Sequence, residues 1–129
     1  MAIVGTGIDL IEVERIEHAL SRPLTGARFR VRVFTAGEIS YCESRGRPRY
    51  QSYAARFAAK EAVMKAMGTG WNRNVAWNQI EVVRERGHAP TIKLHGKSAD
   101  FARRRKITRI HLSLSHTDSF AIAHAIAEE

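Results

Sequence analysis

The stretch QSYAARFAAKEAVMKAM, residues 51–67, decides the fold because it is the strongest helix signal in the chain. It is rich in residues that favour helices, and Gly68 follows as a helix stop. Apolar residues at helical spacing or in alternation predict shorter elements on both sides of it. These are helices over 12–21, 36–44 and 98–105, the last with Ser98 as its cap, and strands over 2–8, 79–85, 91–95, 110–115 and 120–126. Helices combined with a mostly antiparallel sheet predict an α+β fold.

Length and composition predict one globular domain over residues 1–129, because 44% of the residues are hydrophobic and 26% are charged. The single cysteine, Cys42, excludes an intrachain disulfide framework or a zinc site built from several cysteines, and it suits a reducing cytosol. Apolar runs are far shorter than a membrane span, and the first residues lack the basic start of a signal peptide. We therefore expect a cytoplasmic protein.

The charge of the chain predicts an acidic partner. Lys and Arg total 21 against 13 Asp and Glu, which gives a formal charge of +8 and a pI near 10.4. The excess is concentrated over residues 26–56 and in the run RRRK at 103–106. Such a field attracts nucleic acid, a phosphorylated cofactor or an acidic protein. The alternative is a solvated basic surface that only aids solubility.

Asp9 has two interpretations. It follows the glycine-containing stretch GTGI at 5–8, where a ligand or another backbone segment can approach closely, and an acid at a strand end can face a cleft. The spacing of Asp9 and Glu12 also fits a capping box for the helix that follows. In that case Asp9 would only satisfy backbone N–H groups.

Glu61 lies on a largely apolar stripe of the long predicted helix, together with Phe57 and Met64. A carboxylate on such a face is costly to bury unless it is paired or binds a metal. Lys65 follows four residues later, so an ordinary helix ion pair is the simpler interpretation. If Asp9 and Glu61 met, they would suit Mg²⁺, which binds carboxylates and bridges phosphate oxygens, while Lys65 would add a positive charge for phosphate.

Two further features are weak by themselves. His116 stands at a predicted turn, where a histidine can hold a phosphate or accept a proton, although a histidine there is more commonly just exposed. The residues GTG at 68–70 are compatible with a phosphate cradle, although a helix stop explains them more simply.

Taken together, four short blocks resemble a known family. They are GTGIDL at 5–10, RFAAKEA at 56–62, GTG at 68–70 and SLSH at 113–116. In this order they resemble holo-[acyl-carrier-protein] synthases, the short type of 4′-phosphopantetheinyl transferase. The resemblance covers essentially the whole chain, and the first two blocks together are its specific part. Residues 21–50 and 71–79 are not diagnostic.

The resemblance implies transfer of the phosphopantetheine arm of coenzyme A to a serine of apo acyl carrier protein, with release of adenosine 3′,5′-bisphosphate, in fatty acid biosynthesis. By analogy Asp9 and Glu61 hold Mg²⁺, and Glu61, Lys65 and His116 form the catalytic set. The general base, either Glu61 through a water or His116, is left open. Coenzyme A would be bound by Lys65, Gly68, Gly70, Gly87, Pro90, Ser115 and His116.

The resemblance also implies partners. The acidic carrier protein would dock on Arg15 and Arg56, together with some of the arginines at 28–49, and the family's homotrimers carry their sites between subunits. Two alternatives from other classes remain. A nucleic-acid-binding module would explain the pI, although the basic residues lack interleaved stacking aromatics. A non-catalytic protein that binds coenzyme A or a nucleotide would need the glycine turns but not both carboxylates.

Overall fold

The computed structural model describes residues 2–69 and 75–129. The order of its elements confirms an α+β fold. They are β1 (Ile3–Glu12), α1 (Val13–Ser21), α2 (Thr25–Val33), α3 (Ala36–Ser44), α4 (Arg49–Met67), the 3₁₀ turn η1 (Trp77–Gln79), β2 (Ile80–Val83), β3 (Thr91–Leu94), α5 (Gly96–Arg104), β4 (Arg109–His116) and β5 (Phe120–Glu128).

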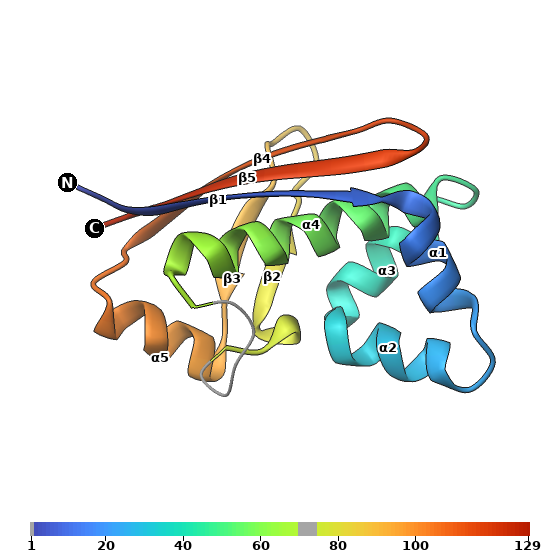
Figure 1. The fold of residues 1–129 in the computed structure, drawn as a ribbon, viewed down its shortest axis with the longest axis horizontal. Helices are drawn as coiled ribbons and strands as arrows, with labels where there is room; N and C mark the ends of the chain where they lie inside the picture. The colour runs from blue at the N-terminus through green and yellow to red at the C-terminus, as the bar shows by residue number, and fades with distance from the viewer. Residues whose placement is uncertain (1, 70–74) are drawn as a thin grey trace.

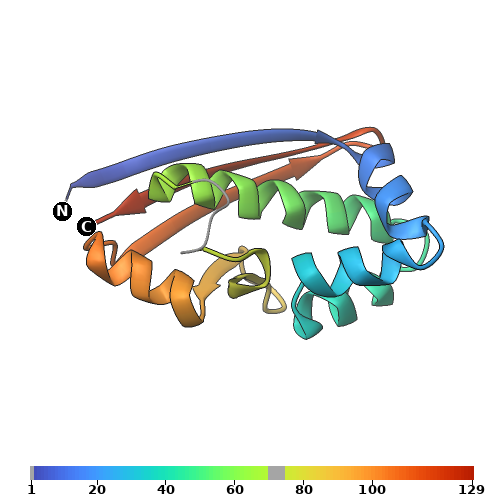
Figure 2. The same ribbon diagram turned by 60° about the horizontal axis from the view of Figure 1, so that its bottom comes forward.

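An antiparallel sheet in the order β1-β5-β4 forms one layer, and α4 lies along one of its faces (Figure 1). The strands β2 and β3 form a separate antiparallel hairpin beside α4. Helices α1, α2 and α3 gather at one end of α4, and α5 lies at the other end, near both chain termini (Figures 1 and 2). Helix α4 is therefore the central element that every layer contacts.

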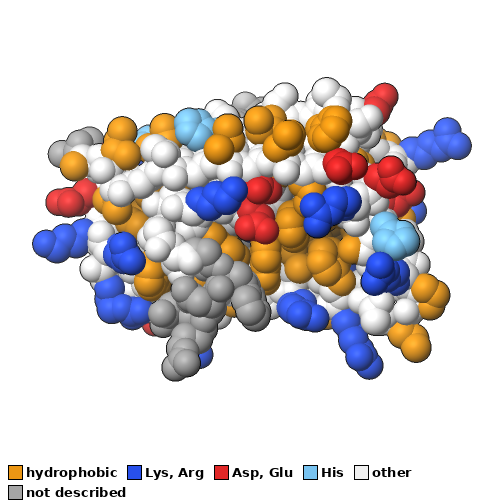
Figure 3. Space-filling model, viewed as in Figure 1, with side chains coloured by type: hydrophobic (Ala, Val, Ile, Leu, Met, Phe, Trp, Pro, Cys, Tyr) orange, Lys and Arg blue, Asp and Glu red, His pale blue; other side chains and the backbone are white. Residues whose placement is uncertain are grey.

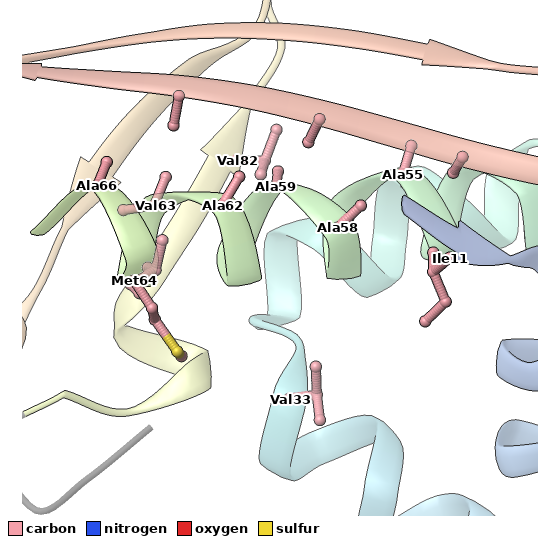
Figure 4. Packing of buried hydrophobic residues seen from close by; sticks show 14 of the residues in the cluster. Ile11, Val33, Ala55, Ala58, Ala59, Ala62, Val63, Met64, Ala66 and Val82 are labelled. Carbon is pink, nitrogen blue, oxygen red and sulfur yellow. The ribbon is translucent and has the colours of Figure 1, made fainter. Parts of the chain in front are cut away.

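Small residues allow the sheet to lie unusually close to α4. Alanines at 121, 123, 125 and 127 of β5 are fully buried, and they face alanines of α4. Figure 4 shows Ala59, Ala62 and Ala66 pointing from the helix toward the strands. A Cβ added at Gly7 of β1 would lie 2.0 Å from the carbonyl oxygen of Ala62, so this crossing requires glycine.

Two expectations from the sequence are corrected, and one helix was not predicted. Residues 25–33 form helix α2, which was not predicted because basic and apolar residues alternate there. Asp9 lies inside β1 and caps no helix, since α1 begins at Val13 without a side-chain cap. Ser98 is not a cap either, because α5 begins at Gly96; its hydroxyl instead joins Gln79 and the backbone of Ala76.

Within residues 2–69 and 75–129, none of the helices combines the length and the apolar character that spanning a membrane requires.

Candidate active site

The fold brings Asp9 and Glu61 together as a carboxylate pair. Asp9 lies on the face of β1 that meets α4, two residues after the close crossing at Gly7. Its side chain is 19% exposed, and Lys65 Nζ lies 3.3 Å from its Oδ1 while donating a hydrogen bond to the Ile8 carbonyl at 2.8 Å. Lys65, one turn after Glu61, thus pairs with Asp9 rather than forming the expected helix ion pair with Glu61.

The electrostatics of the carboxylate pair favour a cation. Burial raises the pKa of Glu61, and the charge of Asp9 raises it further, against the opposing effect of Lys65. When two neighbouring carboxylates oppose each other's ionisation, a divalent ion bound between them stabilises both charged forms. Among the described residues no group of three or more His, Cys, Asp and Glu could hold a metal. Two carboxylates alone leave positions for water and phosphate oxygens, which fits Mg²⁺.

A second feature is a cleft of about 790 Å³ between α3, α4, the segment that follows β2, and the end of β4. We call it the basic cleft, because four arginines line it: Arg45, Arg56, Arg84 and Arg86. Three predicted residues for coenzyme A also line it: Gly87, Ser115 and His116. Its chemistry is that of a polyanion site.

Arg56 is the buried member of the basic cleft. Its side chain is 4% exposed, and its guanidinium lies 4.1 Å from the centre of the Tyr41 ring. In the described part of the chain, its buried Nε atom has no hydrogen-bond partner. A buried donor without an acceptor is costly, so this nitrogen is suited to an anion that enters the cleft. Such burial does not suit the docking role expected of Arg56.

The remaining predicted site residues within the described ranges belong neither to the carboxylate pair nor to the lining of the basic cleft. Gly68 ends α4 in the left-handed region at φ +80°, which confirms the helix stop. Pro90 precedes β3 outside the lining of the cleft. Gly70 lies outside the described residues. Arg15 is exposed on α1, in a groove of about 670 Å³ between α1 and α2 that Arg22 and Arg32 also line.

Within one chain the carboxylate pair and the basic cleft are apart. Arg56 and Glu61 are five residues apart on α4, so they point about 140° away from each other around the helix. Asp9 and His116 pair with Ala123 and Ala121 of β5, on opposite edges of the sheet. From strand geometry their Cα atoms are about 12 Å apart. Helix α4 therefore separates two half-sites.

Arg45, Arg84 and Arg86 were not predicted to bind coenzyme A. The signal that could have identified the last two was their position around Gly87, which was itself predicted. Figure 3 shows the balance of charge on one face, where acidic side chains near the middle lie between basic ones and beside an apolar patch.

Comparisons with known proteins identify the family of the chain. The family model described as "4'-phosphopantetheinyl transferase superfamily" matches residues 5–125, so the chain belongs to that superfamily. Curated relatives named holo-[acyl-carrier-protein] synthase include those of Koribacter versatilis, 48% identical over 98% of this chain and 99% of the relative, and Solibacter usitatus, 47% identical over 98% of each. The resemblance seen in the sequence is therefore confirmed.

Solved structures carry the same name and fold. The holo-[acyl-carrier-protein] synthase of Neisseria meningitidis has a TM-score of 0.89 and 29% identity, over 99% of this chain and 100% of that one. The enzyme of Helicobacter pylori, in complex with coenzyme A, has a TM-score of 0.82 and 29% identity, over 95% and 99%. That of Bacillus anthracis, in complex with "CoA (3',5'-ADP)", has a TM-score of 0.78 and 34% identity, over 97% and 96%.

Proposed function

We propose that this protein transfers the 4′-phosphopantetheine group of coenzyme A to a serine hydroxyl of apo acyl carrier protein, in fatty acid biosynthesis. Membership of the superfamily and the names of the relatives support this reaction. The observation that carries it is the carboxylate pair of Asp9 and Glu61, with Lys65 in contact with Asp9. A protein that only bound coenzyme A would not need to hold two carboxylates together.

Asp9 and Glu61 would hold Mg²⁺, which when bound neutralises charge on the diphosphate and orients it for in-line attack. Lys65, 52% exposed, can turn from Asp9 to a phosphate oxygen. Glu61 would act through a water held beside the diphosphate, and this water would take up the proton of the serine hydroxyl. We assign the general base to Glu61 and the phosphate contact to His116, because His116 lines the basic cleft.

The basic cleft would hold the adenosine 3′,5′-bisphosphate end of coenzyme A. Arg56 supplies the buried, unpaired N–H, and the exposed arginines 45, 84 and 86 supply further charge. Gly87 offers backbone groups without a side chain at the mouth of the cleft. We therefore reassign Arg56 from carrier-protein docking to the binding of coenzyme A.

We infer that the complete site forms between copies of the chain, as in the expected homotrimer. One chain holds its carboxylate pair and its basic cleft on opposite sides of α4, so a neighbouring copy has to bring the second half-site. The outer face of the sheet supports this inference, because four large apolar side chains are exposed there: Ile8, Leu10, Phe120 and Ile122, between 37% and 61% exposed. Such a patch marks an interaction surface.

Mixing two inactive variants tests this arrangement. Glu61→Gln and Arg56→Met each disable one half-site, and mixed assemblies made by co-expression should regain part of the transfer activity. Sites within single chains would give no recovery, because every site would then carry one defect. Light scattering of each variant establishes that assembly itself is intact.

The groove between α1 and α2 would dock the acidic carrier protein through Arg15 and its neighbours. Phe29 lines this groove and stacks on Phe57, with ring centres 6.4 Å apart. Phe57 lies one turn before Glu61, so the groove leads toward the carboxylate pair. We also infer a reducing, cytoplasmic compartment, since Cys42 is the single cysteine of the sequence and lies buried as a free thiol.

The direct test is to incubate the protein with coenzyme A, Mg²⁺ and an apo carrier protein, and to weigh the carrier by mass spectrometry. The proposal predicts a mass gain of one phosphopantetheine group that chelation of the metal abolishes. Binding of coenzyme A without any gain would favour the non-catalytic alternative. Tight RNA binding without any gain would favour a nucleic-acid-binding module.

A further inference from the structure

Glu38 and Lys60 form a buried ion pair that has no role in the proposed reaction. Both side chains are 0% exposed, and Lys60 Nζ lies 2.7 Å from Glu38 Oε1. Lys60 precedes Glu61 in the sequence but points to the other side of α4, into the layer that contains β2. A buried pair of this kind adds little stability compared with apolar residues of the same size, which raises the question of what it does.

The pair binds backbone groups of three residues at the start of the β2–β3 hairpin. Lys60 donates to the carbonyl oxygens of Trp77 at 3.0 Å and Ile80 at 2.5 Å, which together with Glu38 occupy its three N–H groups. Glu38 accepts from the backbone N–H of Val82 at 2.7 Å. The two charges thus bind neighbouring backbone groups of β2, the Ile80 carbonyl and the Val82 N–H.

Glu81 completes the attachment from the exposed side of β2. It accepts a hydrogen bond from the Thr35 hydroxyl at 2.8 Å, and His95 Nε2 lies 2.8 Å from its other oxygen. Although burial raises the pKa of Glu81, the hydrogen bonds from His95 and Thr35 hold it below its usual value. Thr35 is also the N-cap of α3, where it forms a capping box with Glu38. One polar network, Thr35–Glu38–Lys60–Glu81, therefore joins α3, α4 and β2.

This network matters because side chains, rather than a shared strand ladder, attach the described part of the hairpin to the rest of the molecule. In the described part of the chain, β2 and β3 pair only with each other and share no ladder with the sheet of β1, β5 and β4 (Figure 1). The residues that follow β2 are Arg84, Glu85, Arg86 and Gly87, and they form one wall of the basic cleft. Ser115 and His116 at the end of β4 line the same cleft.

We propose that Glu38 and Lys60 are positioning residues that set the width of the basic cleft. They fix β2 against α4, and this keeps the segment 84–87 at the distance from His116 that coenzyme A requires. The inference deepens the proposed function and rests on it. Apolar packing of Ile80 and Val82 holds the hairpin near α4, but hydrogen bonds to individual backbone groups fix its register along the helix.

The test compares Lys60→Met and the double variant Glu38→Gln/Lys60→Met with the wild type. Lys60→Met leaves a buried charge and can fail to fold, whereas the double variant is neutral and keeps an acceptor at position 38. Since misplacement of a binding group by about 1 Å costs on the order of 10²-fold, kcat/KM for coenzyme A should fall by up to that factor. The KM for the carrier protein should stay unchanged, because the groove between α1 and α2 shares no residue with the network.

Two further variants make the result specific. Glu81→Gln weakens the network at a partly exposed position, so it should raise the KM for coenzyme A in the same direction without any risk to folding. Ile107→Ala removes core packing at the far end of β4, and should lower the melting temperature without changing that KM. Calorimetric binding of adenosine 3′,5′-bisphosphate to each variant gives the same comparison without turnover.

Folded variants of the network that bind adenosine 3′,5′-bisphosphate as tightly as the wild type would overturn the proposal. The proposal would also be overturned if the network variants lost kcat/KM equally for coenzyme A and for the carrier protein, and if Ile107→Ala showed the same losses. That result would indicate general destabilisation. A wild-type protein that neither binds this nucleotide nor transfers the arm would instead refute the proposed function itself.

Discussion

Replacement of Gly7 by alanine tests how the carboxylate pair is built. The added Cβ would lie 2.0 Å from the Ala62 carbonyl oxygen and 2.8 Å from Lys65 Cβ. Contacts to a Cβ essentially never fall below 3.0 Å, so β1 has to move from α4 by about 1 Å. The backbone of Gly7 is not in the left-handed region, so the steric contact with α4 is the only obstacle to alanine at this position. Overpacking of this kind costs about 1–3 kcal/mol.

The same movement carries Asp9 away from Glu61. Because displacement of a catalytic group by about 1 Å lowers rates on the order of 10²-fold, Gly7→Ala should lose transfer activity by about that factor while remaining folded. Initial rates of carrier-protein modification, followed by mass spectrometry, together with the melting temperature, give both quantities. A stable Gly7→Ala protein with wild-type rates would refute the idea that the close crossing positions the site.

Gly5→Ala is the matched control, since its Cβ would lie 2.2 Å from the Ala66 carbonyl oxygen. It should destabilise the protein to a similar extent. Its clash lies four residues before Asp9, about 13 Å along the strand, so its activity should fall much less. Equal loss of activity in both variants would indicate that the damage is global rather than at the carboxylate pair.

Three more predictions follow from charges. Burial and the charge of Asp9 raise the pKa of Glu61, so the folded state loses stability as pH rises through that raised pKa. Glu61→Gln should therefore be more stable than the wild type at neutral pH without divalent ions. A series of melting temperatures against pH checks this. Arg15→Glu should raise the KM for the carrier protein several-fold, and weaken its salt dependence, with the KM for coenzyme A unchanged in steady-state assays. Arg56→Met should do the opposite: calorimetry should show weaker binding of coenzyme A, while carrier-protein binding persists.

Much of the fold could be predicted because periodicity is a local property. The long helix, the hairpin over residues 79–95 and the two final strands were predicted within a few residues of their observed bounds. Helix α2 was missed because TGARFRVRV alternates basic and apolar residues as a strand does, whereas its packing on α1 and η1 favours a helix. Predictions fail where tertiary contact overrides local pattern.

The site could be predicted in part, for the same reason. The spacing of Asp9 and Glu12 favoured a helix cap, but strand β1 continues past Asp9 to Glu12. Arg56 looked like a docking residue because sequence gives charge but not burial, and its guanidinium is covered by Tyr41. The two half-sites lie on opposite sides of α4 because of the way the sheet crosses the helix. Residue spacing along the chain carries no information about that crossing.

The most direct measurement is a double-mutant cycle on divalent-ion affinity, with Mn²⁺ binding followed by its paramagnetic signal in the presence of coenzyme A. If Asp9 and Glu61 hold one ion, Asp9→Asn and Glu61→Gln should each lose most of the affinity, and the double variant should bind no more weakly than the poorer single one. Losses that simply add, or an ion bound normally without either carboxylate, would contradict the shared site.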